Sequence, residues 1–534
     1  MRKLQRNTWL LAILSAILQI LIFPLPHLYA LCWIALSPLI FAVLRARPAE
    51  TLQLAGSSGE KRLPATPAQG FLLGYVSGVL WYAGTCYWVF NVMHQYGGLS
   101  SPAAFGILIL FCLYLAIYHG LFGTLLAAMA NQRRRLNRQA VITAPFLWVA
   151  VELLRTRITG FPWDLLGTVQ VDNIPLARVA TVTGVYGLSF EVLLVNTVFA
   201  AAFLVRSNRR NTLVIAALSA AFVLQFGRWI NPGPLPADRI ATLVQSNIPI
   251  LDSAEWTKDY FETTLRDLSA ISTQKSSSAD RHADLIAWPE SPAPFYTSDP
   301  LFRHAVSGLA QRSQAWVLAG SLGVRNASQS PAQATEVFNS GALVSPAGDW
   351  VARYDKVHLV PFGEFVPFKS LFSFASGLTK EVGEFGRGTS RQPLSASPAK
   401  LGVFICYESV FPDEVRQFAR NGAQVFVNVS NDGWYGDSGA YAQHLLQVRM
   451  RAIENERWLL RDTNTGVTAS IDPYGRVVAS LPRKQRLALS APYALTGVTT
   501  FYTRHGDWFA YLCAIISLGA FFARPQRRVT TGRP

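Results

Sequence analysis

Long uncharged apolar runs constrain this chain more than any other feature. They fill residues 1–230 and return in the last thirty residues, whereas residues 237–498 alternate apolar strands with polar helices and turns. A helix of about 20 apolar residues crosses the hydrocarbon core of a bilayer. Only 15% of the 534 residues are charged, well below the roughly 25% of a soluble protein. The sequence therefore predicts a membrane-embedded helical bundle with one large polar domain inserted near its end.

Eight apolar runs are candidates for membrane-spanning helices. They cover residues 9–23, 29–44, 70–92, 103–129, 141–154, 182–205, 212–226 and 508–522. Their interiors hold almost no charge, and a charge inside the bilayer is costly, so we interpret the runs as spans rather than buried core helices. Residues 1–30 also have features of a cleaved signal peptide, but the spans that follow favour retention. The expected domains are a seven-span bundle over 1–236, a polar domain over 237–498, and an eighth span with a basic tail over 499–534.

The basic residues predict the orientation of the spans, because cytoplasmic flanks collect Lys and Arg. With the N-terminus inside, the cytoplasmic segments hold Arg2, Lys3, Arg6, Arg45, Arg47, Lys61, Arg62, Arg133, Arg134, Arg135, Arg138, Arg206, Arg209, Arg210, Arg524, Arg527, Arg528 and Arg533. These eighteen charges, less Glu50 and Glu60, equal the formal net charge of +16. The charge excess is a topology signal, so nucleic acid is not an expected partner. In a bacterium, both termini would be cytoplasmic and residues 237–498 would face the periplasm from the inner membrane.

Residues 237–498 have the pattern of an α/β domain. Apolar β-rich runs predict strands at 240–245, 285–288, 316–319, 340–344, 401–406, 425–429 and 458–461, and helices are expected at 254–271, 300–311, 412–419 and 441–455. Residues 362–390 are rich in phenylalanine but have neither a strand nor a helix period. A loop of this length is usually functional or disordered. We expect it to contact lipid or line an acyl channel, with capping of the core as the alternative.

One cysteine differs from the other four. Cys32, Cys86, Cys112 and Cys513 lie in expected spans, where cysteine usually packs as a small hydrophobic residue. Cys406 is the only cysteine of the polar domain and follows an apolar run that predicts a buried strand. An unpaired thiol is a liability in an oxidising compartment unless the protein uses it. Cys406 is therefore a candidate nucleophile.

Glu290 and Lys356 supply the groups that such a nucleophile needs, and each lies at an expected strand end. A thiol reacts as the thiolate, so it requires a neighbouring positive charge or a base. Glu290 is suited to move the thiol proton. Lys356 is suited to stabilise an oxyanion, a contribution of about 3–4 kcal/mol per well-aimed donor. His358 and His444 are the rival bases, but His358 shares the strand of Lys356 and His444 falls in an expected helix.

Three motifs carry a resemblance to a known superfamily. Ala-Trp-Pro-Glu at 287–290, Tyr-Asp-Lys-Val-His at 354–358 and Ile-Cys-Tyr-Glu at 405–408 resemble the carbon–nitrogen hydrolase (nitrilase) superfamily. This implies an αββα sandwich over about 237–498 with a triad of Glu290, Lys356 and Cys406. With seven preceding spans and one following, and with Asn-Asp-Gly-Trp-Tyr at 431–435, the whole chain resembles the apolipoprotein N-acyltransferase family of the bacterial inner membrane.

The resemblance implies the reaction and its partners. A fatty acyl group would pass from a membrane phospholipid, typically phosphatidylethanolamine, to the α-amino group of the S-diacylglyceryl-cysteine of an apolipoprotein. Cys406 would hold the acyl group as a thioester in a ping-pong mechanism, with Glu290 as general base and Lys356 at the oxyanion, and with no metal or other cofactor. Supporting roles follow for Glu364, Tyr407 and Glu408, and a place near the lipid pocket for Trp256 and Asn339.

Three assignments keep an alternative at this stage. Glu408 would hold Lys356 and tune the thiol, or form a plain structural salt bridge. Trp434 and Tyr435 follow an expected strand and would wall the substrate pocket, or pack in the core.

Two other functions also remain open. A membrane-anchored amidase or nitrilase would use the same triad with water as acceptor, although such an enzyme needs only one anchor. A lipoprotein-binding scaffold or transporter would need no chemistry. Transporters usually carry ionisable residues inside their spans, and this sequence indicates almost none.

Overall fold

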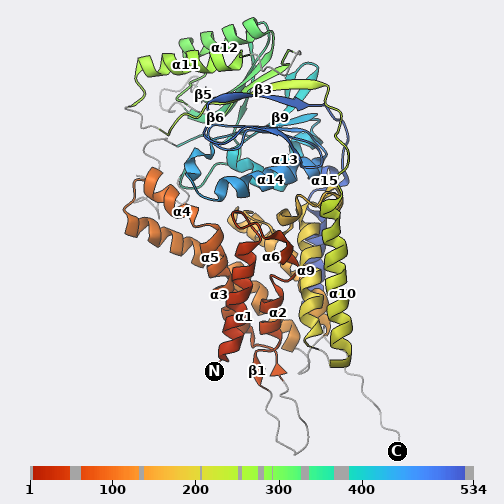
Figure 1. Ribbon diagram of the computed structural model, residues 1–534. Helices are drawn as coiled ribbons and strands as arrows, with labels where there is room; N and C mark the ends of the chain where they lie inside the picture. The colour runs from red at the N-terminus through yellow and green to blue at the C-terminus, as the bar shows by residue number, and fades with distance from the viewer. Residues whose placement is uncertain are drawn as a thin grey trace, which may run out of the picture.

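The computed structural model describes residues 4–48, 62–131, 138–204, 207–250, 255–274, 282–290, 293–325, 336–365 and 384–523. A bundle of helices forms one end of the molecule, and two stacked β-sheets with helices on their outer faces form the other (Figure 1). The first and last helices of the chain both belong to the bundle. The part that contains the sheets is therefore an insertion between helices of one bundle.

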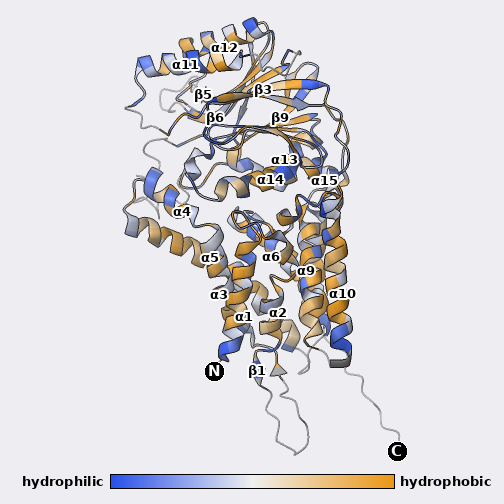
Figure 2. Cartoon of the chain, viewed as in Figure 1, coloured by the Kyte–Doolittle hydropathy of each residue, from blue (hydrophilic) through white to orange (hydrophobic). Residues whose placement is uncertain are grey.

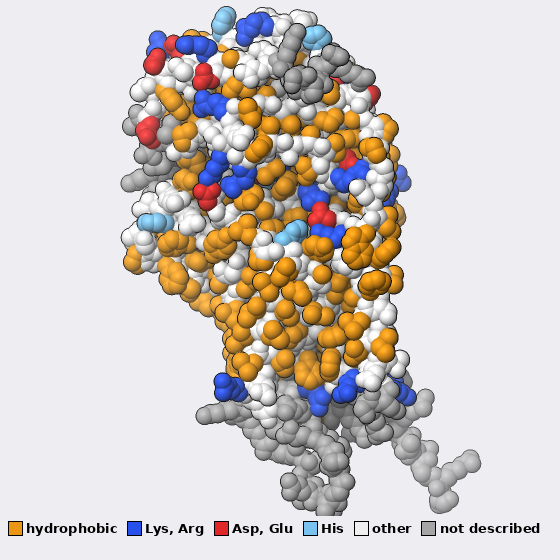
Figure 3. Space-filling model, in the orientation of Figure 1, with side chains coloured by type: hydrophobic (Ala, Val, Ile, Leu, Met, Phe, Trp, Pro, Cys, Tyr) orange, Lys and Arg blue, Asp and Glu red, His pale blue; other side chains and the backbone are white. Residues whose placement is uncertain are grey.

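Each apolar run of the sequence contains a helix of the bundle. The main helices are α1 (Arg6–Leu21), α2 (Ser37–Leu44), α3 (Pro67–Thr85), α5 (Ser101–Asn131), α6 (Arg138–Leu154), α9 (Val185–Ala202), α10 (Ser207–Phe226) and α16 (Trp508–Phe522). Short helices connect them: α4 (Trp88–Asn91), α7 (Ile174–Ala177), α8 (Ala180–Thr183) and α15 (Phe501–His505). Figure 2 shows that the long helices are largely hydrophobic, and Figure 3 shows hydrophobic side chains over the visible surface of the bundle.

Three helices of the described residues are long and apolar enough to cross a membrane: Ser101–Asn131, Val185–Ala202 and Arg209–Trp229. Shorter apolar segments lie at Arg6–Leu21, Tyr29–Leu44, Ile174–Thr183 and Trp508–Phe522. Helix length and composition thus do not confirm all eight expected spans. The other helices are too short or too rich in small and polar residues. For example, α1 has 16 residues. Helix α3 contains four glycines along its length, and Trp81 and Tyr82 lie near its end.

Glycines allow α3 and α5 to pack backbone against backbone. A Cβ added to Gly74 would lie 2.1 Å from the carbonyl oxygen of His119, and one added to Gly123 would lie 2.2 Å from that of Gly70. Small residues at such crossings let two helices approach closely inside a bilayer. The resulting contact holds the middle of α5 in the bundle.

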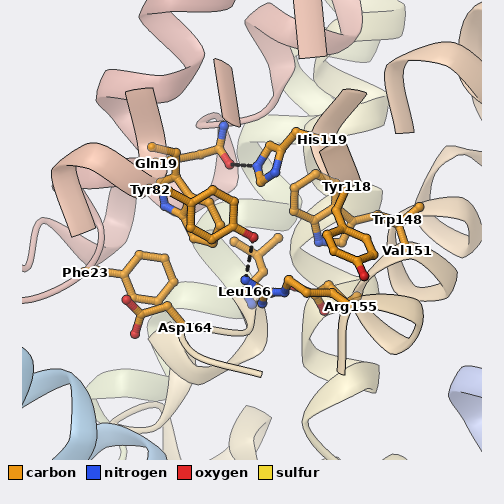
Figure 4. A pocket seen from close by; sticks show the side chains of 12 residues that line it. Gln19, Phe23, Tyr82, Tyr118, His119, Trp148, Val151, Arg155, Asp164 and Leu166 are labelled. Atoms are coloured by element: carbon orange, nitrogen blue, oxygen red, sulfur yellow. Dashed lines mark hydrogen bonds between the residues drawn. The ribbon is translucent and has the colours of Figure 1, made fainter. Parts of the chain in front are cut away.

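The bundle interior contains ionisable side chains that the sequence analysis did not anticipate. Buried residues include His119 on α5, Glu152 on α6, Arg155 just beyond α6, and Asp164 in the following loop. They line a pocket together with several aromatic rings (Figure 4). Arg155 Nη1 donates to Tyr82 Oη at 2.8 Å across it. The expectation of almost no ionisable residues inside the helices is therefore wrong in this region.

Within the described residues, the inserted domain contains two six-stranded sheets. One has the order β14-β3-β4-β5-β6-β7 and the other β13-β12-β11-β10-β9-β8. The first contains β3 (Arg239–Gln245), β4 (Leu285–Trp288), β5 (Trp316–Arg325), β6 (Glu336–Val344), β7 (Trp350–Asp355) and β14 (Leu487–Tyr493). The second contains β8 (Leu394–Ala396), β9 (Ala399–Ile405), β10 (Val425–Ser430), β11 (Leu459–Thr463), β12 (Ala469–Ile471) and β13 (Val477–Ser480).

Helices cover the outer face of each sheet. Figure 1 places α11 (Lys258–Ser272) and α12 (Pro300–Ser313) at the end of the molecule far from the bundle, and α13 (Pro412–Arg420) and α14 (Ala440–Asn455) beside the bundle. Apolar residues of both sheets, such as Leu318 and Val427, form the core between them. The predicted αββα sandwich is confirmed.

The strand directions bring three segments to one edge of the sandwich. Strands β3, β4 and β5 run parallel, and so do β9, β10 and β11. Residues that follow β4, β9 and β10 therefore emerge at carboxyl ends of parallel strands, where α/β proteins commonly build their sites. Glu290, Cys406 and Asn431 occupy these positions.

Candidate active site

Cys406 begins a tight turn at the end of β9. The strand ends at Ile405, and Cys406 has a positive φ of 47° as the first residue of a 3-10 turn. This conformation costs a residue other than glycine on the order of 1–2 kcal/mol, so neighbouring bonds must hold it. Ser409 Oγ donates to the Cys406 carbonyl oxygen at 2.8 Å, and Ile405 N–H donates to Glu408 Oε2 at 2.7 Å.

Lys356 lies between two carboxylates. Its Nζ is 3.3 Å from Glu290 Oε1 and 3.0 Å from Glu364 Oε1, and its side chain is 1% exposed. Burial on its own would lower the pKa of Lys356, but the negative charges of Glu364 and Glu290 outweigh burial and raise it above the ordinary value. The side chain is therefore an ammonium group at any physiological pH.

Asn339 fixes the two carboxylates relative to each other. Its Nδ2 donates to Glu290 Oε1 at 2.8 Å and to Glu364 Oε1 at 2.7 Å. The remaining carboxylate oxygens accept main-chain bonds: Glu290 Oε2 from Asn431 N–H at 2.7 Å, and Glu364 Oε2 from Val360 N–H at 2.8 Å. Every carboxylate oxygen of the pair has a partner, so both side chains are preorganised.

The thiol of Cys406 is protonated in the resting site. Burial raises its pKa above the ordinary value, and the negative charge of Glu290 raises it further. The positive charge of Lys356 acts in the opposite direction but does not compensate. A base must therefore remove the proton during reaction, because the thiolate is the nucleophile.

Glu408 joins the segment after Lys356 to the segment before Cys406. Its Oε1 accepts from the main-chain N–H groups of Val357 at 2.7 Å and His358 at 2.9 Å, and Oε2 accepts from Ile405 N–H. Tyr354 Oη donates to Oε1 at 2.8 Å. Burial raises the pKa of Glu408 to about 7. Within the described residues these partners are main-chain groups and a phenol, so Glu408 forms neither the plain salt bridge nor a direct bond to Lys356.

Comparisons with known proteins match both halves of the chain. A model of the carbon–nitrogen hydrolase family matches residues 240–497, and a model of the apolipoprotein N-acyltransferase N-terminal domain matches residues 15–198. The apolipoprotein N-acyltransferase of Geobacter metallireducens is 33% identical over 97% of this chain and 96% of its own length. The chain belongs to the apolipoprotein N-acyltransferase family. The predictions of this family and of an acyltransferase are confirmed.

A second member of the apolipoprotein N-acyltransferase family, from Methylococcus capsulatus, is 35% identical over 88% of this chain and 90% of its own length. Among solved structures, an amidase from Nesterenkonia sp. is 18% identical with a TM-score of 0.36, covering 53% of this chain and 98% of its own.

Tyr407, Trp434 and Tyr435 reach from the sandwich to the bundle. Tyr407 Oη donates to the Gly160 carbonyl oxygen at 3.0 Å. The Trp434 and Tyr435 rings pack against bundle aromatics, with ring centroids 5.3 Å from Tyr96 and 5.2 Å from Trp88 respectively. The ring of Trp256, another predicted pocket residue, packs on that of Tyr260 of α11, with ring centroids 5.0 Å apart. The loop expected at 362–390 lies mostly outside the described residues.

Neither rival histidine is placed as a base. The His358 ring packs on Phe411 with centroids 3.6 Å apart, and burial lowers its pKa to about 4. His444 contacts Asp432 through Nδ1 at 3.0 Å and Ser409 through Nε2 at 2.7 Å.

Five residues that contribute to the site were not predicted from the sequence: Ser409, Asp432, Tyr354, Ser430 and Arg461. Two of them had a signal, because Asp432 belongs to the motif at 431–435 and Tyr354 to the motif at 354–358.

Proposed function

We propose that this chain transfers a fatty acyl group from a membrane phospholipid to the α-amino group of the N-terminal S-diacylglyceryl-cysteine of apolipoproteins. Membership of the apolipoprotein N-acyltransferase family over nearly the whole chain supports the reaction. The observation that carries the chemistry is the buried Lys356, held between Glu290 and Glu364 beside the carboxyl end of β9. Phosphatidylethanolamine is the proposed acyl donor.

The proposed first half-reaction forms a thioester on Cys406. Glu290 accepts the thiol proton as the sulfur attacks the ester carbonyl of the phospholipid. The Lys356 ammonium stabilises the oxyanion of the tetrahedral intermediate. When the intermediate collapses, the ester C–O bond breaks, and the lysophospholipid leaves with the proton from Glu290. Asn339 and Glu364 support this step because they hold Glu290 and Lys356 in place.

The proposed second half-reaction consumes the thioester. The neutral α-amino group of the lipoprotein attacks the thioester carbonyl and gives its proton to Glu290. The C–S bond then breaks, the thiolate recovers the proton, and an amide remains on the lipoprotein. Because the two substrates follow one another, one site serves both. Exclusion of water from the thioester distinguishes this transfer from hydrolysis.

The proposed topology keeps the three domains and eight spans expected from the sequence, with the sandwich in the periplasm and both termini in the cytoplasm. Figure 3 supports it, because Lys and Arg side chains gather at the end of the bundle opposite the sandwich, with a hydrophobic surface between. Both substrates are anchored in lipid, and drawing an acyl chain into water costs about 0.8 kcal/mol per methylene. A catalytic domain that rests on its own bundle avoids this cost.

The proposal is tested with purified full-length protein, phosphatidylethanolamine labelled in its acyl chains, and a synthetic diacylated lipopeptide. We expect labelled amide on the lipopeptide and equal amounts of lysophospholipid. Cys406→Ala should give neither product, and Lys400→Met, at an exposed position of β9, should react as wild type. Release of labelled fatty acid with no labelled lipopeptide would instead identify a hydrolase that uses water as the acyl acceptor, and would contradict the proposal.

A further inference from the structure

His444 lies on α14 with its side chain fully buried, and it contacts the turn that begins at Cys406. Its Nε2 lies 2.7 Å from Ser409 Oγ and 3.2 Å from the carbonyl oxygen of Cys406. The Ser409 hydroxyl also donates to that carbonyl at 2.8 Å. An imidazole nitrogen and a hydroxyl thus meet at the main chain of Cys406, the residue with the positive φ.

The opposite edge of the ring is tied to the second sheet. Nδ1 lies 3.0 Å from Asp432 Oδ1, and Arg461 on β11 pairs with Asp432 Oδ2 at 2.7 Å. Ser430, at the end of β10, donates to Asp432 Oδ1 at 2.9 Å. Two neighbouring strands therefore fix the orientation of the ring that meets the turn.

These contacts leave His444 unsuited to act as the base. Both ring nitrogens already face other polar groups, as described above. Burial, reinforced by the positive charge of Arg461, lowers the pKa of His444 despite the opposing effect of Asp432. A proton taken from the thiol would have to create an imidazolium in this buried position. The role left to the ring is to hold the main chain.

We propose that His444 is a positioning residue that holds the Cys406 turn in its left-handed conformation during acyl transfer. The inference rests on the proposed function of Cys406 as nucleophile. Without the ring, the Cys406 carbonyl and the Ser409 hydroxyl lose a buried partner, and the turn can relax to an ordinary φ. That change displaces Sγ from Glu290 and Lys356, and small displacements of a reacting atom are costly.

Two variants separate positioning from proton transfer. The side-chain amide of glutamine reaches the place of Nε2, whereas that of asparagine reaches the place of Nδ1. We expect His444→Gln to keep kcat within a few-fold of wild type. We expect His444→Asn, which keeps only the contacts of Nδ1 with Asp432 and Arg461, to lower kcat about 10- to 100-fold with little change in KM for the phospholipid. A general base has no such rescue, because neither amide accepts a proton.

The second readout is alkylation of Cys406 by iodoacetamide, followed by mass spectrometry of its peptide. It should slow in His444→Asn and stay near wild type in His444→Gln and in the control Gln447→Met, a buried position further along α14. Thermal unfolding of each full-length variant in detergent checks folding. Equal loss in both histidine variants, or no loss in either while both fold, would overturn the inference. If the wild type forms no acyl product while alkylation follows the expected pattern, the proposed function fails and the positioning role stands.

Discussion

The active-site network of the sandwich and the polar cluster of the bundle bury charged side chains in different ways. In the sandwich, Lys356 has two carboxylates within 3.3 Å, and Asp432 is paired with Arg461 at 2.7 Å. In the bundle, neither carboxylate oxygen of Asp164 nor Nε of Arg155 has a hydrogen-bond partner among the described residues, although both side chains are buried. A closed network fixes the geometry that chemistry requires. In the bundle cluster, several buried polar atoms have no partner among the described residues, so the positions of its side chains are less tightly fixed.

The largest effect is expected when the central cation of the active-site network is removed. Lys356→Met removes the ammonium and leaves Glu290 and Glu364 close together without their shared cation. We expect kcat for acyl transfer to fall by about 10²–10³-fold or more, because one oxyanion donor is worth that much. The measurement is the lipopeptide assay on protein that unfolds at the wild-type temperature. Near-normal kcat in this folded variant would remove Lys356 from the mechanism.

The state of the thiol gives a pH test of the same network. Because burial and Glu290 raise the pKa of Cys406, alkylation by iodoacetamide should rise about tenfold per pH unit from pH 7 to 9, following the thiolate fraction. The raised pKa also favours folding below about pH 8.5, the ordinary thiol value, and this contribution is lost as pH rises further. A rate that is already level between pH 7 and 8 would mean that the resting sulfur is a thiolate.

Glu408 tests whether main-chain anchoring matters as much as the triad itself. In Glu408→Gln, one acceptor oxygen is replaced by an amide N–H that faces donors such as Ile405 N–H. We expect a loss of about 2–3 kcal/mol in the free energy of unfolding for the unpaired donors, and a roughly tenfold or greater loss of kcat. Glu262→Gln, exposed on α11, is the control. Unchanged stability and rate in both variants would show that Glu408 does not hold the site.

The contact between the halves offers a matched pair of arginines. Arg157 binds Asp507 at 2.6 Å and Asp413 at 3.1 Å, and the Asp507 side chain is 1% exposed. Arg178 binds the more exposed Glu456 at 2.6 Å. Arg157→Ala should cost about 3 kcal/mol, because it leaves a buried carboxylate unpaired, and Arg178→Ala at most about 1 kcal/mol. Chemical denaturation in detergent measures both. Equal losses of stability in the two variants would contradict the expectation that the ion pairs of Arg157 stabilise the protein more than that of Arg178.

The smallest effect is expected inside the bundle. Asp164→Asn removes no hydrogen bond made by its carboxylate to the described residues, and a neutral amide is cheaper to bury than an unpaired charge. We expect the stability of the protein to change by no more than about 1 kcal/mol, or to increase. Asp432→Asn, which breaks the pair with Arg461, should be clearly destabilising. The reverse order of the two variants would invalidate the comparison between the halves.

The sequence predicted the parts of this molecule that depend on local pattern. Apolar runs located the helices, and strand ends located Glu290, Lys356 and Cys406, because a strand buried on both faces has a continuous apolar signature. Strands β8, β12, β13 and β14 were not predicted, and no range was predicted for β7 although Lys356 was placed at a strand end. Several of them are short, and β7 and β13 are edge strands whose exposed positions, such as Val477 and Val478, interrupt the expected alternation.

The parts that were missed depend on tertiary pairing. The partners of His444 come from the turns after β9 and β10 and from β11, and no sequence spacing relates these segments. The supporting role of Glu408 was implied by the family resemblance, but its main-chain partners follow from the approach of the two sheets. The bundle charges were missed because Glu152 is a single residue in an apolar run and Asp164 lies in a loop.

The central claim is that Cys406 carries the acyl group between two lipid substrates. The most direct measurement is mass spectrometry of the Cys406 peptide after full-length protein is incubated with phosphatidylethanolamine alone. The account predicts a fatty acyl adduct on this cysteine that hydroxylamine removes and that disappears when diacylated lipopeptide is added. An acyl product on the lipopeptide without any adduct on Cys406, even under rapid acid quenching, would contradict it.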